Sequence, residues 1–173
     1  MKINKLLYIL LTVTLFTSCV KNDDDETVEY VKVGDIVPVF TVSGQDNVYN
    51  SSNTAGKITL ICFFTTWCPN CHNELPKIEY VWEELQDEVD FELVTIGREE
   101  TLATIAGFWT ESGFSMPYYE DPSRGVYAQF ASATIPRFYI INRDKIIREI
   151  IVGDTTLTQA QWLTKIKSYL ETP

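Results

Sequence analysis

The sequence predicts an α/β fold in which helices flank a central mixed β-sheet. Three observations lead to this prediction. Two short apolar runs, 58–64 and 91–96, have the character of buried strands, and the segment between them has the apolar spacing of a helix. Two further strand-like runs, 137–141 and 146–152, are separated by turn residues, which indicates an antiparallel hairpin. The chain closes with an amphipathic helix over 155–170.

The first 18 residues have the parts of a secretory signal peptide. Lys2 and Lys5 precede an almost continuous apolar run, 6–16, and small residues follow it. The run is too short to cross a membrane as a helix. Residues 15–19 resemble a bacterial lipoprotein box, which implies cleavage before Cys19 and attachment of lipid to its thiol. The alternative is an ordinary cleaved signal with an incidental cysteine.

The remaining chain predicts one domain behind a short tether. Residues 19–30 are acidic and poor in apolar side chains, so we expect a solvated tether there and a single domain over 31–173. The net charge is −10, and it becomes −12 when Lys2 and Lys5 leave with the signal. This charge argues against nucleic acid as a partner. The acidic stretch also resembles the signal that sends some Gram-negative lipoproteins to the cell surface, so both the periplasm and the cell surface stay open.

The domain begins with an extension to the sheet. From Val31, β-branched residues together with Pro38 predict a short edge strand. Residues 44–56, rich in Asn and Ser, predict a loop or a weak hairpin. The strand over 58–64 contains Cys62, which we expect to be a small buried residue, because free cysteine is among the most buried residue types.

The first helix is predicted from residue 69 to about residue 88. Pro69 suits the first helical turn, and apolar residues recur behind it at spacings of three and four. Pro76 interrupts the hydrogen-bond ladder, so we expect a bend at that residue. The helix and its two flanking strands form a β-α-β unit, in which the strands are parallel and the crossover is right-handed.

An inserted helix–strand element follows this unit. Residues 101–112 predict a helix ended by Gly113, and a short strand is expected at 118–119. A third helical segment is predicted over 121–130.

The segment Trp67-Cys68-Pro69-Asn70-Cys71 carries the chemistry. It lies between a buried strand and a helix, so Cys68 would occupy the helix N-terminus, where free N–H groups and the helix dipole stabilise a thiolate. Cys71 follows one turn later and can resolve a mixed disulfide formed at Cys68. The spacing therefore predicts a redox-active dithiol with Cys68 as nucleophile and Cys71 as resolving thiol.

This segment and its surroundings resemble the membrane-anchored thioredoxin-like reductases of the TlpA/ResA type, within the wider group that also contains the peroxiredoxins. The resemblance covers about residues 33–170. It rests on Val33-Gly34-Asp35 with Pro38 and Phe40, on Gly56-Lys57, on residues 63–71, on Glu74 with Pro76, and on Ile135-Pro136. It implies a thioredoxin fold and thiol–disulfide exchange.

The resemblance also implies roles for single residues. The proline that Pro136 matches is cis and lies against the disulfide, and the acid that Glu74 matches tunes the cysteines and relays protons. The implied surroundings of the dithiol are Trp67, Pro69, Asn70 and Ile135. The alternatives are a trans Pro136, a packed aromatic at Trp67, and a Glu74 that only complements the helix dipole.

Two cofactor-binding alternatives to the redox dithiol are a c-type haem and a structural zinc ion. The segment ending in His72 satisfies the C-x-x-C-H signature of c-type haem, with Met116 as the second axial ligand. The β-α-β context and Ile135-Pro136 argue against haem. A structural zinc site normally needs four N or S ligands, and no second cysteine pair is present for one. We therefore expect no cofactor and no metal, and we treat His72 as a surface residue.

The predicted protein is an exported thiol-disulfide oxidoreductase that is held in a bacterial membrane through Cys19. We expect disulfide-bearing exported proteins as substrates, reduction as the favoured direction, and a membrane dithiol carrier as electron donor. A thiol oxidase, a peroxidase of the same fold and a non-catalytic lipid-anchored binding module are the alternatives. The residues before Cys68 lack the Pro of the peroxidatic Pro-x-x-x-Thr-x-x pattern.

Overall fold

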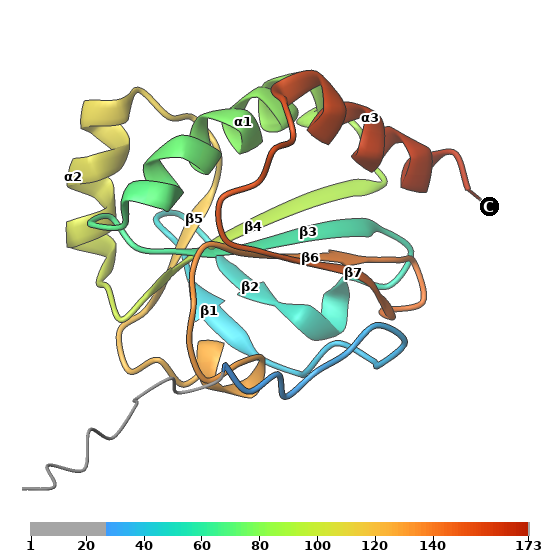
Figure 1. Ribbon diagram of the computed structural model, residues 1–173, viewed down its shortest axis with the longest axis horizontal. Coiled ribbons are helices and arrows are strands. Elements are labelled where there is room, and N and C mark those ends of the chain that lie inside the picture. The colour runs from blue at the N-terminus through green and yellow to red at the C-terminus, as the bar shows by residue number, and fades with distance from the viewer. Residues whose placement is uncertain (1–26, 173) are drawn as a thin grey trace, which may run out of the picture.

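The computed structural model describes residues 27–172 (Figure 1). A five-stranded sheet forms its centre, made of β3 (Ile58–Phe64), β4 (Phe91–Arg98), β5 (Tyr118–Asp121), β6 (Arg137–Ile141) and β7 (Ile147–Val152). Three helices surround the sheet: α1 (Pro69–Leu85), α2 (Leu102–Ser112) and α3 (Gln159–Leu170). The predicted α/β class is confirmed.

The sheet is mixed, as predicted, with strand order β5-β4-β3-β6-β7. β3 precedes α1 in the chain and β4 follows it, and the two strands pair in parallel. This pairing confirms the predicted β-α-β unit. β6 and β7 pair antiparallel and form the predicted hairpin. The inserted α2 and β5 are also present, and β5 extends the sheet parallel to β4. The strand pairings thus place the end of β3 and the start of α1 near the middle of the sheet.

The core has one layer on each face of the sheet. Every residue of β3 is buried, and successive side chains point to opposite faces. Leu60, Cys62 and Phe64 join the cluster under α1 and α3, whereas Ile61 and Phe63 join the cluster on the other face. Cys62 is therefore the buried free thiol that the sequence predicts.

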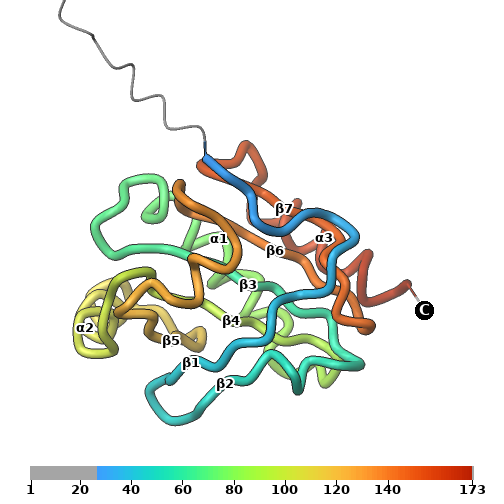
Figure 2. The backbone as a smooth tube through the Cα atoms, turned by 90° about the horizontal axis from the view of Figure 1, so that it is seen from below, coloured from blue at the N-terminus to red at the C-terminus, as the bar shows by residue number. Residues whose placement is uncertain are grey.

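The N-terminal extension covers the sheet face opposite α1 and α3 (Figure 1). Figure 2 shows the first described residues in blue, crossing this face before the chain enters β1 (Thr41–Ser43). β1 pairs with β2 (Val48–Asn50) and forms a short hairpin, one of the two alternatives, loop or weak hairpin, that the sequence leaves open. The edge strand predicted from Val31 is only partly formed: Ile36 makes a single bridge to Ile146. Pro38, two residues later, has no N–H and cannot extend the hydrogen-bond ladder.

The helical segment predicted over 121–130 is wrong. Only Tyr127–Gln129 forms a single 3-10 turn. The Asp121 carboxylate accepts the N–H groups of Val126 at 3.2 Å and Tyr127 at 2.8 Å, and Arg124 has a φ of 60°. These contacts close a compact loop, which a continuous helix would break.

Two predicted helix boundaries also differ. α1 ends at Leu85, not near residue 88, and α3 begins at Gln159, not at Thr155. Thr158 caps α3 in a capping box with Gln161, and Thr155 lies before the helix because its N–H donates to a distant carboxylate. α1 continues through Pro76, and the bend expected there stays a prediction.

Candidate active site at the Cys68–Cys71 pair

The two cysteines lie where the sequence predicts them. Cys68 is the N-cap of α1, with Pro69 as the first helical residue, and Cys71 follows in the first turn. Cys68 keeps 7% of its surface exposed, whereas Cys71 is fully buried. Both are free thiols in this structure. An attacking reagent can therefore reach Cys68 first, with Cys71 close behind it.

Burial distinguishes Cys71 chemically as well. Burial is the main reason why the pKa of Cys71 lies well above its usual range, and the hydrogen bond with Cys68 and the charge of Glu100 raise it further. A thiol with a raised pKa is protonated at neutral pH and is a poor first nucleophile. The geometry therefore supports Cys68 as the attacking thiol and Cys71 as the resolving thiol.

The loop before β6 approaches Cys68 from the other side. The Ile135–Pro136 peptide bond is cis, as the resemblance implies. The Ile135 carbonyl accepts a hydrogen bond from the Cys68 Sγ at 3.9 Å. Ile135 is half-buried and Pro136 is buried, so this loop forms one wall of the site.

Glu74 is fully buried one turn beyond Cys71. Its carboxylate accepts hydrogen bonds from the Lys77 Nζ at 2.8 Å, the Thr155 N–H at 2.7 Å and the Trp162 Nε1 at 3.3 Å. Among the described residues, no hydrogen bond joins Glu74 to Cys68 or Cys71. Glu74 thus links α1 to α3, and its part in tuning the thiols stays a prediction.

The other residues around the dithiol are mostly exposed. Trp67 is 67% exposed, so it is not a packed core aromatic. Pro69 and Asn70 also lie at the surface. His72 is exposed as predicted; its ring lies against Phe108, with centroids 5.0 Å apart, and its Nε2 lies 2.6 Å from the Thr66 carbonyl oxygen.

Glu100 belongs to the site although sequence reasoning missed it. It lies in the loop after β4, is 6% exposed, and accepts hydrogen bonds from the N–H of Thr66 at 2.9 Å and its hydroxyl at 2.7 Å. Thr66 is two residues before Cys68, so Glu100 holds the segment that carries the nucleophile. No local pattern marks Glu100, because its partner is 34 residues away in the chain.

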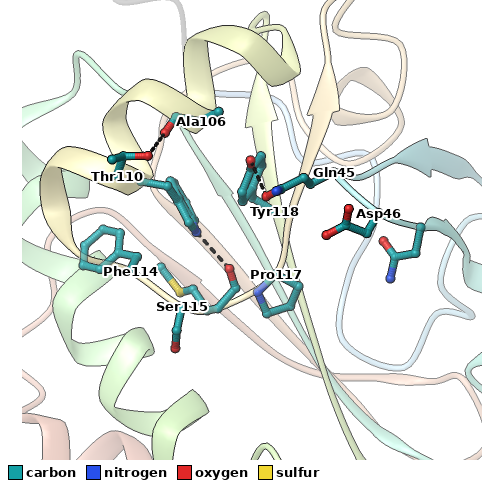
Figure 3. A pocket seen from close by; sticks show the side chains of 11 residues that line it. Gln45, Asp46, Ala106, Thr110, Phe114, Ser115, Pro117 and Tyr118 are labelled. Atoms are coloured by element: carbon teal, nitrogen blue, oxygen red, sulfur yellow. Dashed lines mark hydrogen bonds between the residues drawn. The ribbon is translucent and has the colours of Figure 1, made fainter.

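A separate pocket of about 350 Å³ lies between α2 and the β1–β2 loop (Figure 3). Trp109 in its wall donates a hydrogen bond to the Met116 carbonyl at 2.8 Å, and the Tyr118 hydroxyl donates to Gln45 at 2.7 Å. Neither Cys68 nor Cys71 lines it. The pocket is therefore distinct from the dithiol site.

Within residues 27–172, no group of three or more His, Cys, Asp or Glu side chains could hold a metal ion. In the same range, no helix is long and apolar enough to cross a membrane. Cys19 and the signal-like residues 1–18 lie outside the described residues.

Comparison with known proteins identifies the family of the chain. The AhpC/TSA family model matches residues 33–150. A thiol-disulfide oxidoreductase named ResA from Oceanobacillus iheyensis is 25% identical over 163 residues, covering 91% of this chain and 83% of the relative. A ResA from Bacillus thuringiensis is 23% identical over 140 residues, covering 80% of each chain. The predicted resemblance to the TlpA/ResA type is confirmed.

Solved structures confirm the predicted thioredoxin fold. A solution structure from Bacteroides thetaiotaomicron superposes with a TM-score of 0.76 and 29% identity, covering 82% of this chain and 91% of that one. A thiol:disulfide interchange protein of the thioredoxin family from Chlorobium tepidum has a TM-score of 0.69 and 22% identity, covering 81% of this chain and 99% of that one.

Proposed function

The chain belongs to the AhpC/TSA family, and we propose that it is an exported, lipid-anchored oxidoreductase that reduces protein disulfides through Cys68 and Cys71. One observation carries this proposal: Cys68, 7% exposed at a helix N-terminus, lies beside Cys71, which is fully buried in the first turn and whose pKa burial raises. Curated relatives named thiol-disulfide oxidoreductases support the same reaction.

The proposed reaction has two exchange steps. The Cys68 thiolate attacks one sulfur of a substrate disulfide, which forms a mixed disulfide and releases the first substrate thiolate. The Cys71 sulfur then attacks the Cys68 sulfur, closes the Cys68–Cys71 disulfide and releases the second substrate thiolate. The proton of Cys71 passes to a departing thiolate. Two electrons move to the substrate, and a membrane dithiol carrier then reduces the Cys68–Cys71 disulfide.

The chain's residues supply orientation and proton control. The N-terminus of α1 favours the Cys68 thiolate, which is both the attacking and the leaving group. The Ile135 carbonyl lies within hydrogen-bond reach of the Cys68 Sγ and lines the place where a substrate strand can approach. Burial keeps Cys71 protonated until the mixed disulfide brings it into attack, which limits side reactions of this thiol.

A redox titration of the full-length chain tests the proposal. The protein is equilibrated in thiol buffers, and alkylation mass shifts report the state of Cys68 and Cys71. We expect a reversible two-electron couple near or below roughly −220 mV for a reductase, whereas a value near about −120 mV would assign an oxidase. The absence of a reversible couple would favour a non-catalytic binding module.

Two substitutions identify the roles of the cysteines and the substrates. Cys68→Ser should abolish reduction of a peptide disulfide, because the attacking sulfur is lost. Cys71→Ser should leave the first attack intact and trap mixed disulfides with exported proteins, which mass spectrometry can identify. If Cys71→Ser traps nothing while Cys68→Ser does, the two roles are reversed.

The proposed location rests on Cys19. A lipid on this thiol would hold the domain at a bacterial membrane, facing the periplasm or the cell surface. Metabolic labelling with a fatty acid should mark the wild-type chain and not the Cys19→Ala variant. A labelled Cys19→Ala variant would place the lipid elsewhere or exclude this anchor.

A further inference from the structure

The first four described residues, 27–30, form a strap across the loop that precedes β6. Backbone and hydroxyl groups join the strap to residues 130–134, about a hundred positions later in the chain. The hydrogen bonds are Thr27 Oγ1 with Thr134 Oγ1 at 2.8 Å, Val28 N–H to Ser132 Oγ at 2.8 Å, Ser132 N–H to the Val28 carbonyl at 2.9 Å, and Tyr30 N–H to the Phe130 carbonyl at 2.9 Å. Residues assigned to the tether from sequence therefore contact the domain.

The buried guanidinium of Arg137 contacts both the strap and the same loop. Arg137, the first residue of β6, is 1% exposed, and its Nη1 donates to both carboxylate oxygens of Glu29 at 2.7 Å. Its Nε donates to the carbonyls of Ala133 at 3.0 Å and Thr134 at 2.9 Å. A buried charge is costly unless it is paired. Glu29 therefore stabilises the buried Arg137 guanidinium in the position where its Nε binds these carbonyls.

The loop needs this support because its backbone is strained. Thr134 has a φ of 72°, a left-handed conformation that is unfavourable for a β-branched residue. Its carbonyl also accepts a hydrogen bond from the Tyr127 hydroxyl at 2.7 Å. Thr134 directly precedes Ile135, whose carbonyl accepts from the Cys68 Sγ at 3.9 Å. A shift at Thr134 is therefore passed on to the acceptor beside the nucleophile.

We propose that Glu29 is a positioning residue for the dithiol: through Arg137 it holds the 133–135 loop, and thereby the Ile135 carbonyl, against Cys68. This inference rests on the proposed function of the Cys68–Cys71 pair. It adds that a residue of the strap influences the reactivity of Cys68. The Ile135 carbonyl is an acceptor for the protonated Cys68 thiol, so it favours the thiol over the thiolate and the disulfide. Loosening the loop weakens this preference.

The test compares Glu29→Gln with wild type in the full-length protein, purified in detergent. Glu29 is partly exposed and Gln still offers one oxygen to the Arg137 Nη1, so we expect the variant to remain folded while Arg137 loses its charged partner. Because iodoacetamide reacts with the thiolate and the variant loosens the acceptor of the thiol proton, we expect it to alkylate Cys68 about threefold faster in the variant. The equilibrium of the pair with glutathione should move toward the disulfide by a similar factor.

A matched control separates positioning from a general loss of charge. Glu149→Gln removes the charge from a partly exposed ion pair away from the 133–135 loop, between Glu149 on β7 and Lys165 on α3 at 2.6 Å, and should leave both readouts at wild-type values. Unchanged Cys68 alkylation in Glu29→Gln overturns the inference, as does an equal change in both variants. The failure of this inference is distinguishable from failure of the proposed function, because loss of a reversible couple would appear in wild type itself, whereas this inference fails when Glu29→Gln behaves like wild type.

Discussion

Glu74 and Glu100 are both buried carboxylates near the dithiol, but they come from different regions and bind different groups. Glu74, on α1, accepts hydrogen bonds from Lys77, Thr155 and Trp162 and so joins two helices. Glu100, in the loop after β4, binds the N–H and hydroxyl of Thr66 next to the active-site cysteines.

The difference lies in how each charge is compensated. The Lys77 ammonium, 2.8 Å away, pairs with the Glu74 carboxylate, and within residues 27–172 no ion pair involves Glu100. The charge of Glu100 adds to burial in raising the pKa of Cys71, whereas Glu74 adds to burial in raising the pKa of Cys62. The acid that the motif identifies thus joins two helices, whereas the acid whose charge raises the pKa of Cys71 lies elsewhere in the sequence.

The largest expected effect concerns stability. Glu74→Ala should destabilise the reduced protein by about 3 kcal/mol, because it leaves the buried Trp162 N–H without an acceptor and also removes the partner of the half-buried Thr155 N–H. Glu100→Ala should cost about 1–2 kcal/mol, since Thr66 is half-buried and water can reach it. Chemical denaturation of both variants measures the difference. Equal losses would contradict the separation of the two roles.

An intermediate effect is expected from pH. Burial raises the pKa of both Cys71 and Cys62, so the unfolded chain releases these protons first, from about pH 8.5. Their contribution to the free energy of unfolding is complete below that pH. It falls as the pH rises, by up to about 1.4 kcal/mol per pH unit for each thiol. In the oxidised protein only Cys62 contributes, so the slope should be about half.

Denaturation of the reduced and oxidised forms between about pH 8 and about pH 9 measures these slopes, because tyrosines in the unfolded chain, with a pKa of about 10, are still mostly protonated there. A reduced Cys71→Ala variant is the control, and it should follow the oxidised slope. Identical slopes for the reduced and oxidised wild type would show that the Cys71 thiol is not protonated by burial.

The smallest effect separates the two carboxylates directly. In a Cys68→Ala background, Glu100→Gln should lower the pKa of Cys71 by less than about one unit, because one negative charge is removed while the burial stays. Glu74→Gln should leave this pKa unchanged. The pH dependence of Cys71 alkylation measures both. A decrease of equal size in Glu74→Gln would restore the tuning role that the family resemblance implies.

Much of the fold could be predicted because the relevant signals are local. The apolar run over 58–64, the spacing after Pro69 and the turn before β7 each lie within a short window. The error over 121–130 has a local origin too: Asp121-Pro122 is typical of a helix start, but the Asp121 carboxylate instead closes a loop on Val126 and Tyr127.

The position of Cys68 at the junction of a buried strand and a helix, with Cys71 one turn later, follows from the sequence alone, because helix and strand periodicities are encoded in neighbouring residues. The contact of Glu100 with Thr66, 34 positions away, and the pairing of Glu29 with Arg137, 108 positions away, form only in the folded molecule. Such partners share no window of sequence. They meet because the sheet order and the path of the N-terminal extension bring them together. A single acidic residue in the sequence does not indicate which distant donor its carboxylate will bind.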